Sequence, residues 1–337
     1  MAVKTVNLAL QGGGAHGAFT WGVLDRLLED GRVAIEGVSA TSAGAMNGAC
    51  LAYGMAVGGP TAARRVLERF WTGVSDAGFS LAQPTWFGPL QGGWGLQWSP
   101  FFLAADLMAR LFSPYELNPL NLNPLRRVLE AAVDFAVLRR PDPPVKLFLS
   151  ATDVRSGRLK VFERHEISAD AVLASACLPF AFHAVEIGGE AYWDGGYTGN
   201  PALFPLIRGC ESRDLVVVHV NPTRRAEVPR AARDILNRVN EIGFNSSLWR
   251  ELRAVQFVNA LLEDGLVREG RLKRVFVHAI AADEVMGRLG AHSALNTSRV
   301  FLRHLRDAGR RHAGEWLERC HADLGVRSTV DLPAEQL

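Results

Sequence analysis

Residues 1–60 alternate between apolar runs typical of strands and amphipathic runs typical of helices. An apolar run over 3–10 predicts a strand, and a glycine-rich turn separates it from an amphipathic segment over 18–30. A second apolar run over 33–41 predicts another strand, and a helix is expected from Ala43 onward. This order of strand, helix, strand and helix indicates an α/β protein.

Later parts of the chain repeat these two patterns. Near-continuous apolar runs over 215–220 and 275–280 are typical of parallel strands that are buried on both faces. The other expected strands are 145–152, 159–162 and 184–193, and the other expected helices are 61–71, 118–140, 169–176, 231–262 and 282–324. Together they predict a three-layer α/β/α fold with a mainly parallel central sheet and a helical C-terminal extension.

The composition changes over residues 71–117. Half of the eight tryptophans lie in this aromatic-rich insertion, namely Trp71, Trp86, Trp94 and Trp98. Such a stretch is expected to form a lid or acyl-chain groove, or to pack as a satellite core. We expect a catalytic domain over 1–225 that carries the insertion, and a mostly helical part over 226–337 that packs on the same domain.

Composition argues against several classes of protein. The 337 residues are 48% hydrophobic, which suits a sizeable core, and a formal net charge of +2 argues against a nucleic-acid partner. The four cysteines have no CxxC spacing, which favours reduced thiols in the cytoplasm over a disulfide framework or a zinc site. Neither a signal peptide nor an apolar run long enough to span a membrane is evident, so any membrane contact is expected to be peripheral.

A glycine-rich turn follows the first expected strand. Backbone N–H groups at such a turn can bind a negative charge. The spacing of Gly12, Gly14 and Gly17 matches a dinucleotide fingerprint with Glu36 as the candidate ribose ligand, which predicts an oxidoreductase. The run Gly12, Gly13 and Gly14 equally suits an oxyanion hole for an acyl-transfer intermediate.

The turn after the second expected strand carries Ser42. Ala40 and Gly44 flank it at the two positions that must be small where a strand turns sharply into a helix around a nucleophilic serine. Glycine is commoner than alanine at the first position, so Ala40 is a departure from the pattern. Ser42 alone would also fit an ordinary helix N-cap. The oxyanion-type loop on the preceding strand favours the nucleophile.

A serine nucleophile requires a base that accepts its proton. The candidate histidines for this role are His16, His183, His219 and His278. None lies in an arrangement like the late histidine of a hydrolase triad. Asp194 instead ends a strand, and Gly195 and Gly196 let the following loop bend back, although Asp-Gly is also an ordinary turn. At its reference pKa of about 3.9, this aspartate would be ionised at neutral pH.

In their order and spacing, these three motifs resemble the patatin-like phospholipase family. The segment 174–179 and the pair Asn200–Pro201 are also similar to that family. The resemblance covers residues 4–220 well and the remainder more loosely. It implies a dyad of Ser42 and Asp194, with the glycine-rich loop as oxyanion hole, and no cofactor or metal is expected.

The expected function is therefore hydrolysis of lipid acyl esters, of the phospholipase A type. Within the same mechanism, a hydroxyalkanoate polyester or a small acyl ester remains open as the substrate. Two other classes also remain open: the dinucleotide-binding oxidoreductase, and a non-catalytic lipid-binding protein for which Ala40 is the only hint. A basic stripe on the last helix, formed by Arg299, Arg303, Arg306 and Arg310, suits either anionic lipid headgroups or plain solvent exposure.

Overall fold

One sheet of eight strands forms the centre of the computed structural model, which describes residues 2–77, 112–223, 225, 228–230, 232–268, 270–287, 289 and 291–330. The strands are β1 (Lys4–Leu10), β2 (Val33–Ala40), β3 (Lys146–Asp153), β4 (Leu159–Phe162), β5 (Val185–Ile187), β6 (Glu190–Asp194), β7 (Asp214–Val218) and β8 (Phe276–Ile280). The path of hydrogen-bonded neighbours is β5-β6-β3-β2-β1-β7-β8, in which β2 and β6 pair with successive parts of the same side of β3 and β4 pairs with its other side. Pairings among β1, β2, β3, β7 and β8 are parallel, whereas those of β4, β5 and β6 are antiparallel.

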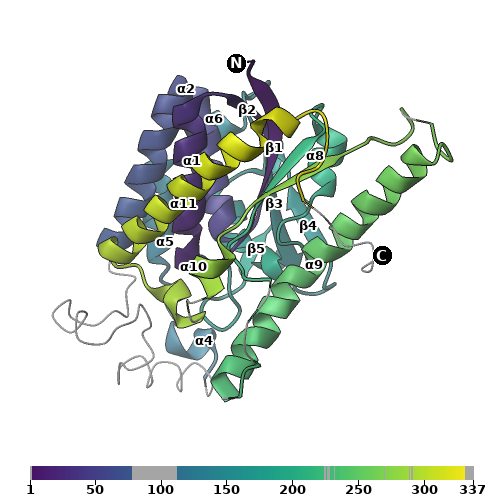
Figure 1. Ribbon diagram of the computed structural model, residues 1–337. Helices are drawn as coiled ribbons and strands as arrows, with labels where there is room; N and C mark the ends of the chain where they lie inside the picture. The colour runs from purple at the N-terminus through teal and green to yellow at the C-terminus, as the bar shows by residue number, and fades with distance from the viewer. Residues whose placement is uncertain are drawn as a thin grey trace.

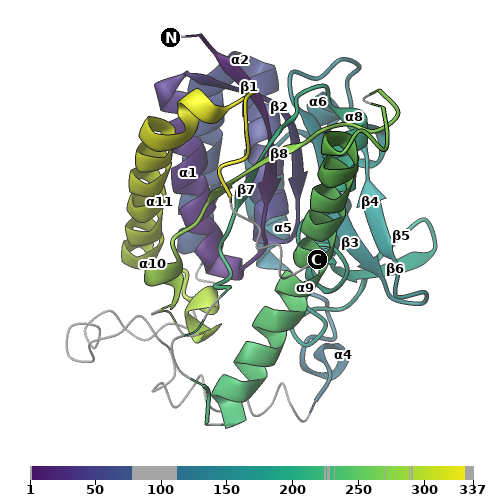
Figure 2. The ribbon, with the colours of Figure 1, turned by 45° about the vertical axis from the view of Figure 1, so that its right-hand side comes forward.

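Helices cover both faces of this sheet (Figures 1 and 2). They are α1 (Gly17–Asp30), α2 (Ala43–Asp76), α4 (Pro114–Leu117), α5 (Pro124–Ala132), α6 (Phe135–Leu138), α7 (Ala169–Ser175), α8 (Phe204–Gly209), α9 (Ala232–Glu263), α10 (Asp283–Gly287) and α11 (Arg299–Cys320). Short 3-10 turns are η1 (Gly14–His16), η3 (Arg164–Glu166), η4 (Gly195–Tyr197), η5 (Ala291–Leu295) and η6 (His321–Asp323). In Figure 2, α1, α2 and α11 lie on one side of the sheet and α9 on the other.

Successive residues of the parallel strands enter two different hydrophobic clusters. Leu8 and Leu10 belong to the cluster that includes α1 and α11, whereas Ala9 belongs to the cluster that includes α8 and α9. The residues of β7 alternate in the same way. Because side chains of a strand point alternately to its two faces, this alternation requires helices on both sides. The predicted three-layer α/β/α fold is confirmed.

Some expected elements are corrected by the structure. The helix expected over 118–140 is two short helices, since Pro124 starts α5 and Asp134 caps α6 through the Ala136 N–H. The strand expected over 184–193 is the hairpin β5–β6, which turns at Gly188 and Gly189, both with positive φ. The helix expected from Ala43 and that over 61–71 form α2, which bends at Gly58 and Gly59.

The aromatic-rich insertion is described only at its two ends. Residues 78–111, with Trp86, Trp94 and Trp98, lie outside the described residues. Trp71 is a buried residue of α2, where it stacks on Trp21 and donates from Nε1 to Asn47 Oδ1 over 3.0 Å. Trp71 is therefore part of the core. Residues 114–117 form α4.

The part after residue 225 contributes a strand as well as helices, because β8 pairs with β7 in the central sheet. Its last helix, α11, packs closely on α1. A Cβ atom on Gly22 would lie 1.9 Å from the Arg306 carbonyl oxygen, and one on Gly309 would lie 2.1 Å from that of Phe19. The two glycines therefore allow the helix backbones to approach each other.

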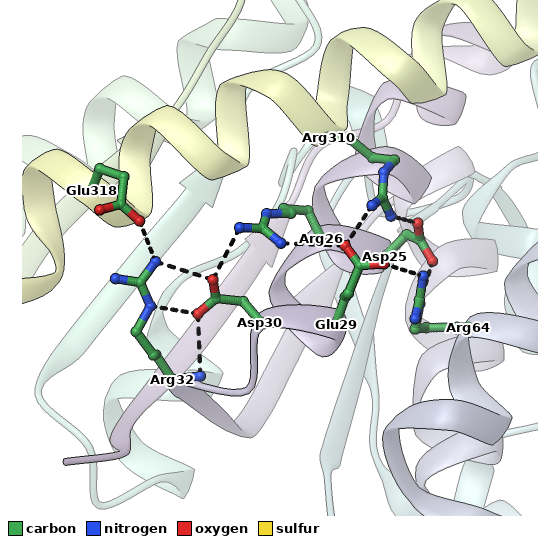
Figure 3. A network of polar contacts seen from close by, with 8 residues as sticks. All are labelled: Asp25, Arg26, Glu29, Asp30, Arg32, Arg64, Arg310 and Glu318. Atoms are coloured by element: carbon green, nitrogen blue, oxygen red, sulfur yellow. Dashed lines mark hydrogen bonds and ion pairs between the residues drawn. The ribbon is translucent and has the colours of Figure 1, made fainter. Parts of the chain in front are cut away.

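Ion pairs also connect α11 to α1 (Figure 3). Arg310 pairs with Asp25 and Glu29 of α1, and Glu318 pairs with Arg32, which follows α1 and also pairs with Asp30 at the end of that helix. Within the basic stripe, Arg299 pairs with Asp76, and Arg306 pairs with Asp307 and lies over the Trp21 ring. Most of the stripe is thus engaged within the protein, which favours a structural role over headgroup binding. None of the described helices has the length and hydropathy needed to cross a bilayer.

Candidate active site

The turns that follow β1 and β2 lie side by side. The two strands are parallel, and Leu10 pairs with Ala40 at their carboxyl ends. The glycine-rich loop therefore starts beside the elbow, and Gly12 packs against Ser42 and Thr41. A parallel sheet commonly places ligands outside this edge.

Ser42 has the backbone conformation of a strained turn, with φ 57° and ψ −123°. A residue with a side chain is uncommon at such a φ and persists only where its surroundings hold it there. Its side chain makes no capping hydrogen bond to α2, so Ser42 is not an ordinary N-cap. A Cβ atom on Gly44 would lie 2.3 Å from the Leu10 carbonyl oxygen, so the elbow requires glycine there. The methyl group of Ala40 is fully buried in the core, where it is accommodated.

Ser175 holds the elbow from the end of α7. The Ser42 N–H donates to Ser175 Oγ over 2.9 Å, and Ser175 is fully buried. Segment 174–179 is similar to the family named above, but that similarity assigns no role to this serine. A lone serine at the end of a helix has no signature that would reveal its partner.

The pairing of β3 with both β2 and β6 places Asp194 beside the elbow. At Leu149 this strand pairs with β2 on one side and β4 on the other, and at Ala151 it pairs with β6 and β4. β6 therefore continues the position of β2 along the same side of β3. Since Ala40 pairs with Leu149 and Asp194 pairs with Ala151, Asp194 lies next to the turn that carries Ser42.

The carboxyl group of Asp194 is almost completely buried. Burial raises its pKa to about 6, against hydrogen bonds from the Gly196 N–H and the Ser42 side chain that lower it. Oδ1 accepts the Gly196 N–H over 2.7 Å, whereas Oδ2 has no hydrogen bond of good geometry among the described residues. The Ser42 hydroxyl is thus near the carboxyl group but loosely aligned with it, as is common for a nucleophile and its base before substrate binds. This pKa lies above the reference value of about 3.9, yet the carboxyl group is still mostly ionised at pH 7, as expected from the sequence.

The two glycines after Asp194 are required by close contacts. A Cβ atom on Gly195 would lie 2.2 Å from the Ser150 carbonyl oxygen. One on Gly196 would lie 3.0 Å from Asp194 Oδ1 and 3.1 Å from the Phe244 ring. These contacts hold the carboxyl group between β3 and α9.

The N–H groups of the glycine-rich loop differ in what they bind. The Gly12 N–H donates to Asn200 Oδ1 over 2.7 Å, so it is not available to an oxyanion in this arrangement. Within the described part of the chain, the N–H groups of Gly13 and Gly14 have no protein acceptor. Gly17 packs against Ala43 at the start of α2, where a Cβ atom on Gly17 would lie 2.7 Å from that of Ala43.

Glu36 is held at the opposite edge of the sheet. Its carboxylate accepts the N–H groups of Glu211 and Ser212, both over 2.8 Å, and pairs with Lys146. Burial would raise its pKa, but these contacts hold the pKa below its usual value. Because Glu211 and Ser212 precede β7, this carboxylate lies at the amino ends of the strands, which disfavours dinucleotide binding at the glycine-rich loop.

Three of the four candidate histidines have hydrogen-bond partners away from Ser42 and Asp194. His16 Nε2 lies 2.6 Å from Ser293 Oγ, and burial lowers the pKa of His16 to about 4. His278 bonds to Asp214 and Thr329, and His183 bonds to the Pro114 carbonyl oxygen. Burial lowers the pKa of His219 to about 4, and its Nδ1 has no partner among the described residues. In the same residues, none of the four hydrogen bonds to Ser42 or Asp194, and no group of His, Cys, Asp or Glu could hold a metal ion.

Comparisons with known proteins give a family and several similar solved structures. The family described as patatin-like phospholipase matches residues 8–207. Similar solved structures include VipD from Legionella pneumophila, at 18% identity and a TM-score of 0.44, covering 93% of this chain and 66% of that one. Another is full-length ExoU in complex with SpcU from the type III secretion system of Pseudomonas aeruginosa, at 18% identity and a TM-score of 0.35, covering 94% and 53%. This chain thus spans about two thirds and about half of those chains, and no curated protein matches it.

Proposed function

The chain belongs to the patatin-like phospholipase family, and from this premise we propose that it hydrolyses lipid acyl esters with Ser42 as nucleophile and Asp194 as base. The observation that carries the proposal is the meeting of three features at one edge of the sheet. They are the strained Ser42 turn, the buried Asp194 carboxyl group, and the Gly13 and Gly14 N–H groups, which have no acceptor among the described residues. Each supplies a part that acyl transfer requires.

In the proposed reaction, Ser42 Oγ attacks the ester carbonyl carbon while Asp194 accepts the hydroxyl proton. The N–H groups of Gly13 and Gly14 stabilise the oxyanion, and Asp194 returns the proton to the departing alcohol. Water then attacks the acyl-enzyme with Asp194 again as base, which restores Ser42 and releases the carboxylic acid. A pKa of about 6 leaves Asp194 mostly ionised at pH 7 and makes it a stronger base than an ordinary aspartate.

Apolar side chains that face solvent near the site favour a substrate in a lipid aggregate. Exposed apolar residues of this kind are Tyr115, Leu117, Leu120, Leu122 and Phe180. The two segments that carry them touch, since Tyr115 stacks on His183 with ring centroids 4.1 Å apart. Phe180 lies shortly after Cys177, whose carbonyl oxygen accepts the Asp194 N–H. We propose that this surface contacts lipid peripherally, in the cytoplasm.

Other substrates remain within the same mechanism, because neither Ser42 nor Asp194 distinguishes one alcohol part of an ester from another. A hydroxyalkanoate polyester or a small acyl ester is the alternative substrate. The non-catalytic alternative is disfavoured by the strain retained at Ser42, which a lipid-binding protein would not need.

Fatty acid release from phosphatidylcholine vesicles, together with hydrolysis of p-nitrophenyl esters and of a hydroxybutyrate polyester, tests the proposal. Wild type, Ser42→Ala and Asp194→Asn are compared with the control Asp153→Asn, which also changes a carboxylate that accepts a nearby backbone N–H. We expect both site variants to lose activity by at least about 10³-fold while the control keeps it. Full activity of either site variant would refute the dyad, and turnover of only the polyester would refute the lipid substrate.

A further inference from the structure

The residue before the glycine-rich loop has a side chain that is bonded at both ends. Gln11 is fully buried, and its Oε1 accepts the N–H groups of Val220 and Asn221 over 3.1 and 3.2 Å. Its Nε2 donates to Asn245 Oδ1 over 3.1 Å. The end of β1 is thereby joined to the loop after β7 and to α9.

The first glycine of the loop is held on both sides of its backbone. Its N–H donates to Asn200 Oδ1, and its carbonyl oxygen accepts from Asn221 Nδ2, each over 2.7 Å. Both contacts fix Gly12 immediately before Gly13 and Gly14, the proposed oxyanion donors. A shift of Gly12 would therefore shift the donors of Gly13 and Gly14.

Helix α9 supports both Asn200 and Asn221. Asn245 Nδ2 donates to the Pro222 carbonyl oxygen over 3.3 Å, next to Asn221. Ser247 Oγ accepts the Asn200 N–H over 3.2 Å. Asn245 and Ser247 are buried, and both lie beyond residue 207, where the family match ends.

Burying this many amide groups contributes little to the free energy of folding. A buried amide gains little net free energy from its hydrogen bonds, and leaving one unpaired is destabilising. An oxyanion donor, by contrast, contributes fully only where its position is fixed before the reaction. The buried amides are therefore best explained by their directional hydrogen bonds, which fix the position of the loop. Apolar packing would not fix it in this way.

We propose that α9 is part of the catalytic apparatus, with Asn245 and Ser247 as positioning residues. Asn245 acts through Gln11, and Ser247 acts through Asn200, to place the Gly13 and Gly14 N–H groups against the oxyanion. The inference rests on the proposed function, because it assigns α9 to the same site. A purely structural role for these contacts is the alternative.

The same helix offers a matched control. Asn259 also lies on α9 and also binds backbone, with Nδ2 donating to the Val275 carbonyl oxygen over 2.8 Å and Oδ1 accepting the Val275 N–H over 3.1 Å. Neither contact leads to the glycine-rich loop. Asn259→Leu therefore removes a comparable attachment of α9 without touching the proposed path.

The test compares Asn245→Leu with Asn259→Leu in the full chain. For each variant, kcat and KM are measured with an ester substrate and expressed per active site. Active sites are counted from the amount of fluorophosphonate that is covalently bound. The affinity for a trifluoromethyl ketone, which forms an oxyanion with Ser42, is measured as well. We expect Asn245→Leu to lower kcat by about 10- to 100-fold with little change in KM, and to weaken ketone binding by a similar factor. Asn259→Leu is expected to lower Tm while kcat stays within about threefold of the wild type.

A kcat for Asn245→Leu within about threefold of the wild type, or an equal fall in both variants, would overturn the inference. Asn245→Asp, which keeps the acceptor for Gln11, is expected to recover part of kcat. If Asn245→Leu does not fold, Ser247→Ala against the exposed neighbour Ser246→Ala decides the question, since each removes one oxygen atom. An inactive wild type would instead refute the proposed function, so the two failures are distinguishable.

Discussion

Gly12 lies so close to Ser42 that a Cβ atom on Gly12 would come within 2.5 Å of Ser42 Cβ. It would also lie 3.0 Å from the Thr41 carbonyl oxygen. Since real Cβ atoms do not approach so closely, any side chain at Gly12 must displace the loop or the elbow. The glycine-rich loop and the nucleophile turn are therefore in direct contact through backbone and Cβ atoms.

Gly12→Ala is predicted to impair catalysis more than folding. Displacement of the loop or elbow by about 1 Å should lower kcat by on the order of 10². Steady-state kinetics and thermal unfolding measure the two effects. Gly243→Ala is the control, because a Cβ atom there meets nothing within 4 Å, and it should leave kcat unchanged. Wild-type kinetics in Gly12→Ala would contradict the contact.

The pH dependence of activity should report Asp194. Only the carboxylate accepts a proton, and burial raises the pKa of Asp194 to about 6. We therefore predict that kcat/KM with a soluble ester rises as pH increases through about 6 and becomes constant above about pH 7. A profile that stays flat down to about pH 4.5, as an aspartate of ordinary pKa would give, would be inconsistent with the buried base.

Asp194→Asn should make the protein more stable at high pH while it removes activity. Because the folded-state pKa of about 6 lies above the unfolded value of 3.8, the folded state binds more protons between these values, and stability falls as pH rises through that window. Removing the buried charge should raise the free energy of unfolding by about 1 to 3 kcal/mol at pH 8 and by little at pH 4. Denaturant unfolding at both values measures this, and a variant that is less stable than wild type at pH 8 would contradict it.

The contact between α1 and α11 predicts a strong effect at Gly309. A Cβ atom there would lie 2.1 Å from the Phe19 carbonyl oxygen, so Gly309→Ala should force the helices apart and cost about 1 to 3 kcal/mol of stability. Gly314→Ala on the same helix is the control, since its Cβ atom would meet only Arg26 Nε, at 3.5 Å. It should be neutral or slightly stabilising. Equal destabilisation by the two substitutions would rule out the close packing.

The sequence predicted the features that are encoded locally. The strands β1 and β2 and the turn at Ser42 follow from short runs of residues whose conformational needs are evident from their own neighbours. The hairpin turn at Gly188 and Gly189 is encoded in the same way, but it lies within a longer run that predicts a single strand.

Features that depend on distant parts of the chain were not predictable. Asn245 contacts Gln11 across 234 positions, and Ser175 contacts Ser42 across 133, so neither polar residue has a local pattern that reveals its partner. The raised pKa of Asp194 likewise arises from burial by other elements. That the Gly12 N–H is already bonded was not predictable either, because its acceptor is the distant Asn200.

Covalent labelling by a fluorophosphonate, with the modified peptide identified by mass spectrometry, tests the central claim most directly. We predict one adduct per chain, located on Ser42, which disappears in Ser42→Ala and forms much more slowly in Asp194→Asn. Folded wild-type protein that is not labelled, or an adduct on another residue that persists in Ser42→Ala, would contradict the assignment of Ser42 as the nucleophile.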